Sequence, residues 1–346
     1  MITALTFLHG VLPTFGGQPG TPYLTLAGQS SGASLIRALL GTPAALPLFT
    51  NAWLHSDPVN YGFLTPGGLE ILRQSWNEEL GCTDNCGQTM DLPTLLDHAD
   101  TLFSDASGID PEFYFAEPFR PSPDNVFMTS RFTSSSSFAP SGSLKPIVVT
   151  TVKDEAVPSI YGFFPALPDP GFLVPFLNGN IGPDRTSQVL NSSFYQPIND
   201  DIRISLSTMG TDSAWRCASY KLVRDWAAHG SSKQYSGVIT KGITYPDNSS
   251  VYRCLDPGVV CHQDDIQVLF GTGPITSPLT AELQARYKAF VRTSNPNSGN
   301  YKSWSPATAS DTKTINLGGS SAITLDACVP TFWGSQVQFD YQVNNE

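Results

Sequence analysis

The chain has 346 residues, of which 40% are hydrophobic and 14% charged, and its formal net charge is −11. This length is enough for one large domain with a sizeable core, and the acidic balance disfavours nucleic acid and anionic membrane surfaces as partners. No stretch approaches the roughly 18 apolar residues of a membrane-spanning helix, so we expect no transmembrane segment.

Helices are predicted where apolar residues recur at a spacing of about 3.6, and strands where β-branched residues cluster. In chain order we expect a helix over residues 4–15, a strand over 23–27, helices over 35–40, 67–80 and 95–103, a strand over 145–152, a helix over 211–229, a strand over 235–245, a helix over 277–294 and closing strands within 309–326. Strands alternate with helices and no internal repeat is visible, which predicts the α/β class and a single domain over residues 1–346.

A candidate reactive serine lies between the first predicted strand and the next helix. Residues 28–32 read Gly-Gln-Ser-Ser-Gly and match the pattern G-x-S-x-G. In a strand–turn–helix context this pattern predicts a tight turn that exposes Ser30, flanked by glycines because side chains there would collide with neighbouring backbone. The following helix offers N–H groups to a developing oxyanion. The alternative is a Gly/Ser-rich loop that matches by chance, since the pattern fixes only three residues.

A serine nucleophile requires a histidine as general base. The sequence has five histidines, and those at positions 9, 98 and 229 fall in predicted helices, where structural or solvent-exposed roles are expected. His262 instead lies in a loop directly after Cys261, where a disulfide would tether it. We therefore take His262 as the candidate base.

The base in turn requires a carboxylate that orients it, and in α/β-hydrolases this acid lies between the serine and the histidine in the chain. Asp154 and Glu155 directly follow the strand predicted over residues 145–152. Open α/β sheets build their sites at the carboxyl ends of strands. These two residues are therefore the candidate acids.

Three separated stretches resemble the type B carboxylesterase and cholinesterase family of α/β-hydrolases. FGGQP…LTLAGQSSGAS resembles F-G-G-D-P…G-E-S-A-G-A, VKDEA resembles N-K-D-E-G, and VCHQDDIQVLFG resembles a segment that begins H-G-x-E and ends V-F-G. The resemblance extends from about residue 4 to residue 333 and implies a mostly parallel central sheet flanked by helices. It also implies ester hydrolysis through an acyl-enzyme, with Ser30 as nucleophile, Glu155 as acid, His262 as base and the Ser31 backbone N–H as an oxyanion donor.

Several positions depart from the family pattern. Gln29 and Asp265 stand where the family has glutamate, Ser31 replaces alanine and Gln263 replaces glycine. The family carries an H-G-G-G oxyanion loop far upstream of its serine, whereas only 29 residues precede Ser30 here and none of them spells that motif. We therefore expect a sheet without the family's N-terminal strands and a poorly soluble chain with little activity on simple esters.

Serine carboxylic-ester hydrolysis is the predicted function. The alternatives are a non-catalytic fragment, a pseudoenzyme or an interaction module of the same fold, and a peptidase. We expect a small-molecule ester as substrate and no cofactor or metal ion. Five aromatic residues follow the acid segment and either line an apolar pocket or pack a surface subdomain: Tyr161, Phe163, Phe164, Phe172 and Phe176.

The sequence contains six cysteines and two N-glycosylation sequons, at Asn191 and Asn248. Together they favour an oxidising, extracellular compartment, although the N-terminal segment lacks the features of a signal peptide and we expect such a signal in a further N-terminal portion. The family resemblance implies disulfides between Cys217 and Cys328, between Cys82 and Cys86, and, from the two cysteines left, between Cys254 and Cys261. Six cysteines allow fifteen pairings, and the sequence leaves the others open.

Overall fold

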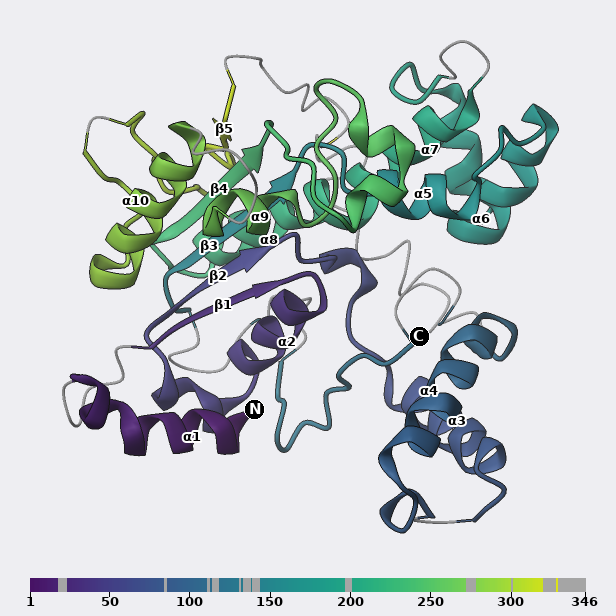
Figure 1. Cartoon of the computed structure of the whole chain (residues 1–346), viewed down its shortest axis with the longest axis horizontal. Helices are drawn as coiled ribbons and strands as arrows, with labels where there is room; N and C mark the ends of the chain where they lie inside the picture. Colours follow the sequence, from purple (N-terminus) through teal and green to yellow (C-terminus); the bar gives the residue numbers. More distant parts are fainter. Residues whose placement is uncertain are drawn as a thin grey trace.

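A computed structural model describes residues 1–17, 24–83, 86–110, 113, 118–130, 132, 138, 144–196, 201–271, 278–299, 301–319 and 328. Within them five parallel strands form one sheet in the order β1-β2-β3-β4-β5 (Figure 1). The strands are β1 (Thr25–Gln29), β2 (Asn51–His55), β3 (Ile147–Val152), β4 (Gln234–Ile239) and β5 (Ile315–Leu317). The helices are α1 (Ile2–Val11), α2 (Ser31–Leu40), α3 (Pro66–Glu79), α4 (Leu92–Asp105), α5 (Val157–Phe163), α6 (Leu173–Asn191), α7 (Ile202–Gly210), α8 (Cys217–Ala228), α9 (Asp264–Phe270) and α10 (Pro278–Thr293).

Helices cover both faces of the sheet because its strands are apolar on both sides. On β2, Ala52 and Leu54 pack in one hydrophobic cluster with residues of α2 and α8. Trp53, which points to the opposite face, packs in a second cluster with residues of α9 and α10. Continuous apolar strands buried on both faces are typical of parallel sheets, and the predicted α/β class with a mostly parallel sheet is confirmed.

Several elements differ in extent from those predicted. The helix expected over 211–229 is longer, because α7 continues through a π-helical segment, Thr211–Arg216, into α8. The strand expected over 235–245 ends at Ile239, and of the closing strands only β5 lies within the described residues, since 320–327 lie outside them. The helices expected near 67–80, 95–103 and 277–294 correspond to α3, α4 and α10.

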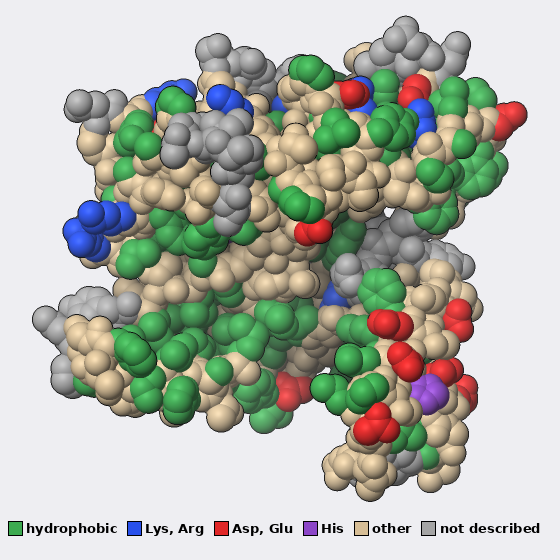
Figure 2. Space-filling view, viewed as in Figure 1, with side chains coloured by type: hydrophobic (Ala, Val, Ile, Leu, Met, Phe, Trp, Pro, Cys, Tyr) green, Lys and Arg blue, Asp and Glu red, His purple; other side chains and the backbone are tan. Residues whose placement is uncertain are grey.

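Helices α3 and α4 form a small lobe beside the main body (Figure 1). They share a hydrophobic cluster built around Leu64, Leu72, Leu102 and Phe113. Acidic side chains gather on the outside of this lobe (Figure 2). Among the described residues, no helix combines the length and apolarity needed to cross a membrane.

The structure confirms two of the implied disulfides, Cys217–Cys328 and Cys254–Cys261. Cys82 is also disulfide-bonded, but the side chain of Cys86 lies outside the described part of the chain, so that pairing stays a prediction.

Candidate active site

Ser30 occupies a sharp turn between β1 and α2. Its backbone angles, φ 56° and ψ −121°, lie in a region that a residue with a side chain rarely adopts. Two hydrogen bonds fix the turn from both sides: the Ser30 N–H donates to the carbonyl of His55 at 2.9 Å, and the Ser30 carbonyl accepts from Ala33 N–H at 2.9 Å. The strand–turn–helix geometry that the motif predicts is therefore present.

The two glycines of the motif have different roles. A Cβ built on Gly28 would lie 2.5 Å from the backbone carbon and oxygen of Gly32 and 2.8 Å from the nitrogen of Ala33. A Cβ on Gly32 would meet no atom within 4 Å. The expectation that both flanking positions exclude side chains is therefore wrong for Gly32, because only Gly28 faces the returning helix backbone.

Gly28→Ala is expected to destabilise the fold by about 3 kcal/mol or more, because rigid backbone would have to move away from the new methyl group. Gly32→Ala is the matched control and should leave the free energy of unfolding nearly unchanged. Thermal denaturation of the two purified variants measures the difference. Equal stability of both variants would contradict the role assigned to Gly28.

A buried ion pair holds α2 against the end of β2. The Nε of Arg37 donates to Oδ2 of Asp57 at 2.8 Å, and the hydroxyl of Ser34 donates to Oδ1 of the same carboxylate at 2.8 Å. Arg37 and Asp57 are both buried, and the Arg37 guanidinium lies over the ring of Phe63 at 4.5 Å. These contacts fix the helix that begins directly after Ser30.

Glu155 and His262 are joined directly although 107 residues separate them. Oε2 of Glu155 lies 2.6 Å from Nδ1 of His262, and Oε1 accepts the backbone N–H of Val152 at 2.8 Å. Since a carboxylate only accepts, Nδ1 of the imidazole carries the proton in this contact. This is the orientation that an acid in a catalytic triad imposes on the base.

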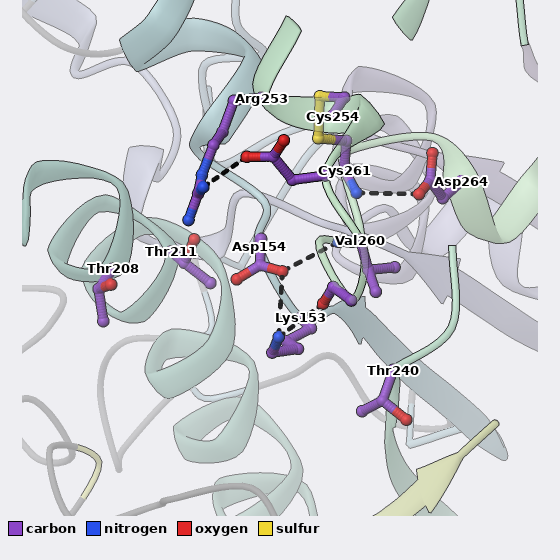
Figure 3. Close-up of polar contacts among 12 residues, drawn as sticks. Lys153, Asp154, Thr208, Thr211, Thr240, Arg253, Cys254, Val260, Cys261 and Asp264 are labelled. Carbon is purple, nitrogen blue, oxygen red and sulfur yellow. Dashed lines mark hydrogen bonds and ion pairs between the residues drawn. A yellow bond between two sulfur atoms is a disulfide. The ribbon is translucent and has the colours of Figure 1, made fainter. Parts of the chain in front are cut away.

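The loop that carries His262 is attached to the residues just before Glu155 (Figure 3). Asp154 forms a parallel β-bridge with Cys261, and its carboxylate accepts the N–H of Val260 at 2.9 Å. The ammonium of Lys153 donates to the carbonyl of Gly258 at 2.7 Å. Because Asp154 and Cys261 immediately precede Glu155 and His262, and the other partners lie within four residues of them, this attachment brings Glu155 and His262 together.

The disulfide and a buried aspartate complete the attachment of this loop. Cys254–Cys261 closes the turn before His262, and Asp264 accepts the N–H of Cys261 at 2.9 Å (Figure 3). Asp264 also accepts an N–H from the side chain of Asn248 at 2.8 Å. Burial raises the pKa of Asp264 to about 7, against these hydrogen bonds and with the help of the nearby Asp265 charge.

The same network bears on the two predicted glycosylation sites. The Asn248 side chain is buried and its Nδ2 donates to the carbonyl of Ile243 and to Asp264. The native fold therefore leaves no room for a glycan on Asn248. Asn191, the last residue of α6, is exposed.

The charged form of His262 is favoured by its neighbours. Burial opposes the imidazolium, but the hydrogen bond and charge of Glu155, together with the charges of Asp265 and Asp264, outweigh burial and raise the pKa of His262 above its ordinary value of 6.5. The ring of Trp215 lies 5.7 Å from the imidazole. An imidazole in this environment accepts a proton more readily than a free one.

The other imidazole nitrogen of His262 contacts Gln29, the residue before the serine. Nε2 of His262 lies 2.9 Å from Nε2 of the Gln29 side chain. Within the described part of the chain, Ser30 and His262 share no side-chain hydrogen bond, and the contact of this nitrogen is with the residue that precedes Ser30. The Ser31 N–H belongs to the first turn of α2 and has no helical carbonyl to bind, which leaves it available to an oxyanion.

An apolar cavity of about 650 Å³ lies next to the acid and the base. Its wall includes Ala156, which follows Glu155, and Trp215, which contacts the ring of His262. No charged side chain lines it among the described residues. Phe163 and Phe176 line the cavity. Phe164 and Phe172 pack against these rings, and Tyr161 is buried under the guanidinium of Arg203. Both expectations for the five aromatic residues therefore hold in part: two of them line the cavity and the others pack around it.

The remaining four histidines all have partners in the structure, and the partner of His55 was not predicted from the sequence. His9 contacts the carbonyl of Leu48, His98 contacts Glu79, and His229 contacts a carbonyl of its own helix. His55, the last residue of β2, forms a buried pair with Asp265, with 2.8 Å between Nδ1 and Oδ2. Asp265 in place of the family's glutamate was the one local signal for this pair, because the strand that ends at His55 was not predicted.

The sheet, the turn at Ser30 and the covering helices are those of an α/β-hydrolase. Structures of esterases resemble this one: a thermophilic PNB esterase (TM-score 0.68, 20% identity), a PNB esterase (0.64, 22%) and a Clostridium hathewayi esterase described as hydrolysing aliphatic aromatic polyesters (0.61, 20%). Each comparison covers 91% of this chain but only 61–63% of the other, so the chain spans about three fifths of their length.

The family model of the carboxylesterases matches residues 1–327, and the chain belongs to the carboxylesterase family. A curated relative, a probable N-octanoylanthranilate hydrolase of Rhodococcus erythropolis, is 39% identical over 80 residues, which is 23% of this chain and 17% of the relative.

Proposed function

We propose that the chain hydrolyses carboxylic esters through an acyl-enzyme formed on Ser30, with His262 as general base and Glu155 as the acid that orients it. The observation that carries this proposal is the 2.6 Å contact between Glu155 and Nδ1 of His262, whose other nitrogen contacts Gln29, the residue before a serine in a strained turn. Membership of the carboxylesterase family supports the same reaction class.

In the reaction, the Ser30 oxygen attacks the ester carbonyl carbon while Nε2 of His262 takes the hydroxyl proton. The negative charge of Glu155 stabilises the resulting imidazolium. The tetrahedral intermediate then collapses, the carbon–oxygen bond to the alcohol breaks, and His262 returns its proton to the departing alkoxide. Water attacks the acyl-enzyme by the same proton transfers, which releases the acid and restores Ser30.

The Ser31 N–H is the proposed oxyanion donor. It lies at the positive end of the α2 dipole and directly follows the nucleophile, so it points at the region where charge develops. Each oxyanion donor contributes roughly 10²–10³ in rate, so one donor supports a slow reaction and further donors would accelerate it.

The proposed substrate is an ester with an uncharged, apolar acyl or alcohol group. The cavity beside His262 has aromatic walls and no charged lining residue among those described, so it would exclude a charged group by its desolvation cost. Its volume of about 650 Å³ suits a group of medium size. We also propose that the protein is secreted and carries a glycan on the exposed Asn191, since disulfides persist in oxidising compartments.

Ser30→Ala is expected to abolish covalent labelling by a fluorophosphonate and turnover of a p-nitrophenyl ester above the background rate, because it removes the attacking oxygen. Ser31→Ala is the matched control: it keeps the backbone N–H and removes only a neighbouring hydroxyl, so labelling should persist. Mass spectrometry of the labelled peptide identifies the modified residue. Labelling or turnover that survives Ser30→Ala would contradict the proposal, and failure of the folded wild-type chain to react would support the non-catalytic alternative.

A further inference from the structure

Three side chains form a row across the sheet, at the last residues of β1 and β2 and near the end of β3. Gln29 pairs with His55 in the register of β1 and β2, and His55 pairs with Thr150 in that of β2 and β3. Register partners on parallel strands point to the same face and lie about 4.8 Å apart. Gln29 and His55 are therefore neighbours on the face that α9 and α10 cover.

The side chain of Gln29 is hydrogen-bonded to Nε2 of His262, the nitrogen that the proposed reaction requires. Because Nδ1 of His262 donates to Glu155, the neutral ring presents a lone pair at Nε2, and an N–H of the Gln29 amide donates to it at 2.9 Å. That lone pair is the one that must accept the proton of Ser30. In the state seen here the base is therefore occupied by the residue next to the nucleophile.

His55 offers a second acceptor of the same kind. Its Nδ1 donates to the buried carboxylate of Asp265 at 2.8 Å, which leaves a lone pair on Nε2. Nε2 is buried and has no hydrogen-bond partner among the described residues. The rings of Trp53 and Tyr287 stack with the imidazole, at centroid distances of 5.5 and 5.9 Å, and hold its plane.

A cavity of about 310 Å³ lies beside the side chains of Gln29 and His55. Gln29 and His55 both line it, together with Tyr287, Gln263 and residues of α9. One water molecule occupies about 30 Å³ of liquid, so the space is sufficient for a side-chain amide to change its orientation. Buried acceptors without a partner are rare in native proteins, and the Nε2 of His55 is therefore an acceptor to which a donor on the cavity side can bind.

We propose that the Gln29 amide exchanges between His262 and His55, and that it is a positioning residue which frees the base when it turns to His55. This inference rests on the proposed function, because it assigns the state in which Nε2 of His262 faces Ser30. The exchange breaks one hydrogen bond and forms an equivalent one, so its free-energy cost is small. The second acceptor for the amide is Nε2 of His55, whose ring is held in place by the contact of Nδ1 with Asp265.

The test uses three variants and the rate at which a fluorophosphonate labels Ser30. His55→Asn keeps a donor at the position of Nδ1 for Asp265 and removes the acceptor at Nε2. His55→Gln places a side-chain amide oxygen near the position of Nε2 instead. Gln29→Leu removes the amide that moves.

His55→Asn is expected to slow labelling roughly tenfold, the net effect of one lost hydrogen bond, because Gln29 then stays on His262. His55→Gln should restore much of the rate. Gln29→Leu should label at least as fast as the wild type, and adding His55→Asn to it should change nothing. In ¹⁵N spectra the Nε2 resonances of both His262 and His55 should move in Gln29→Leu, whereas loss of the static contact alone would move only that of His262. His98→Asn is the control for loss of a distant histidine.

Two results would overturn the exchange. If His55→Asn slows labelling equally in the wild-type and Gln29→Leu backgrounds, His55 acts through stability, or its Nε2 binds only cavity water. If Gln29→Leu labels more slowly than the wild type, the amide assists the base directly. Loss of labelling in Ser30→Ala is required first, so failure of the proposed function is recognised separately.

Discussion

Glu155→Gln is expected to lower kcat/KM about 10⁴-fold while the fold persists. The new amide oxygen can still accept the N–H of Val152, but the amide nitrogen then faces Nδ1 of His262, and both are donors. The ring must shift its proton to Nε2, where it can no longer accept the proton of Ser30. Steady-state hydrolysis of a p-nitrophenyl ester, with circular dichroism as the check on folding, measures the effect.

The pH dependence of the hydrolysis rate is a second, independent measurement of the effect of Glu155→Gln. Since the base works unprotonated, the rate rises with pH through the pKa of His262, which lies above 6.5 in the wild type. Glu155→Gln removes the hydrogen bond and charge that raise this pKa and leaves burial, which lowers it. The acidic limb of the residual activity should therefore move to lower pH.

Asp154→Asn is the matched control for the acid. Its amide oxygen can still accept the N–H of Val260, so the loop attachment survives and the rate should fall far less than in Glu155→Gln. An equally large loss in Asp154→Asn would transfer the role of acid to Asp154.

Removing the disulfide between Cys217 and Cys328 is expected to lower the free energy of unfolding by about 5 kcal/mol, because the cysteines are 111 residues apart and the bridge restricts a long loop of the unfolded chain. The paired substitution Cys217→Ala and Cys328→Ala should lower Tm by on the order of 10 °C. Thermal scans at one fixed rate, with and without reductant, measure this. A variant as stable as the oxidised wild type would refute the expectation.

Removing the disulfide between Cys254 and Cys261 should affect stability less and activity more than removing the long bridge. Cys254 and Cys261 are only 7 residues apart, so their removal should cost about 2.5 kcal/mol in the same chain-entropy treatment. Yet this bridge directly precedes His262, so the double alanine variant should lose more activity per folded molecule than the variant without the long bridge. The two variants thus separate stability from positioning.

The sequence was most informative where a local motif fixes a local geometry. The turn at Ser30 follows from Gly28 and the strand–helix context, and the nearness of Glu155 to His262 followed from two motifs carried by the family resemblance. By contrast, the contact between Gln29 and His262 depends on how α9 docks on the sheet, which residue patterns along one segment do not encode. The pair of His55 and Asp265 was missed for the same reason, since 210 residues separate its members.

Helix and strand limits failed where tertiary contacts override local preference. The run from α7 into α8 passes through Gly210, and glycine disfavours a helix interior by its intrinsic propensity. In the structure a Cβ on Gly210 would lie 2.9 Å from the Cβ of Ala156, so glycine is present because α5 packs closely there. The sequon at Asn248 was likewise a sound local pattern whose side chain the fold uses to hold Asp264.

The bridge between Asp154 and Cys261 has a consequence for how this protein can change over evolutionary time. It joins Glu155 and His262 through the residues next to them, so the excursion of the chain over residues 157–210 need not contribute to their geometry. That excursion contains α5, α6 and α7, which supply most of the wall of the 650 Å³ cavity. Insertions, deletions and substitutions there can remodel what the cavity accepts while the proton-transfer pair stays in register.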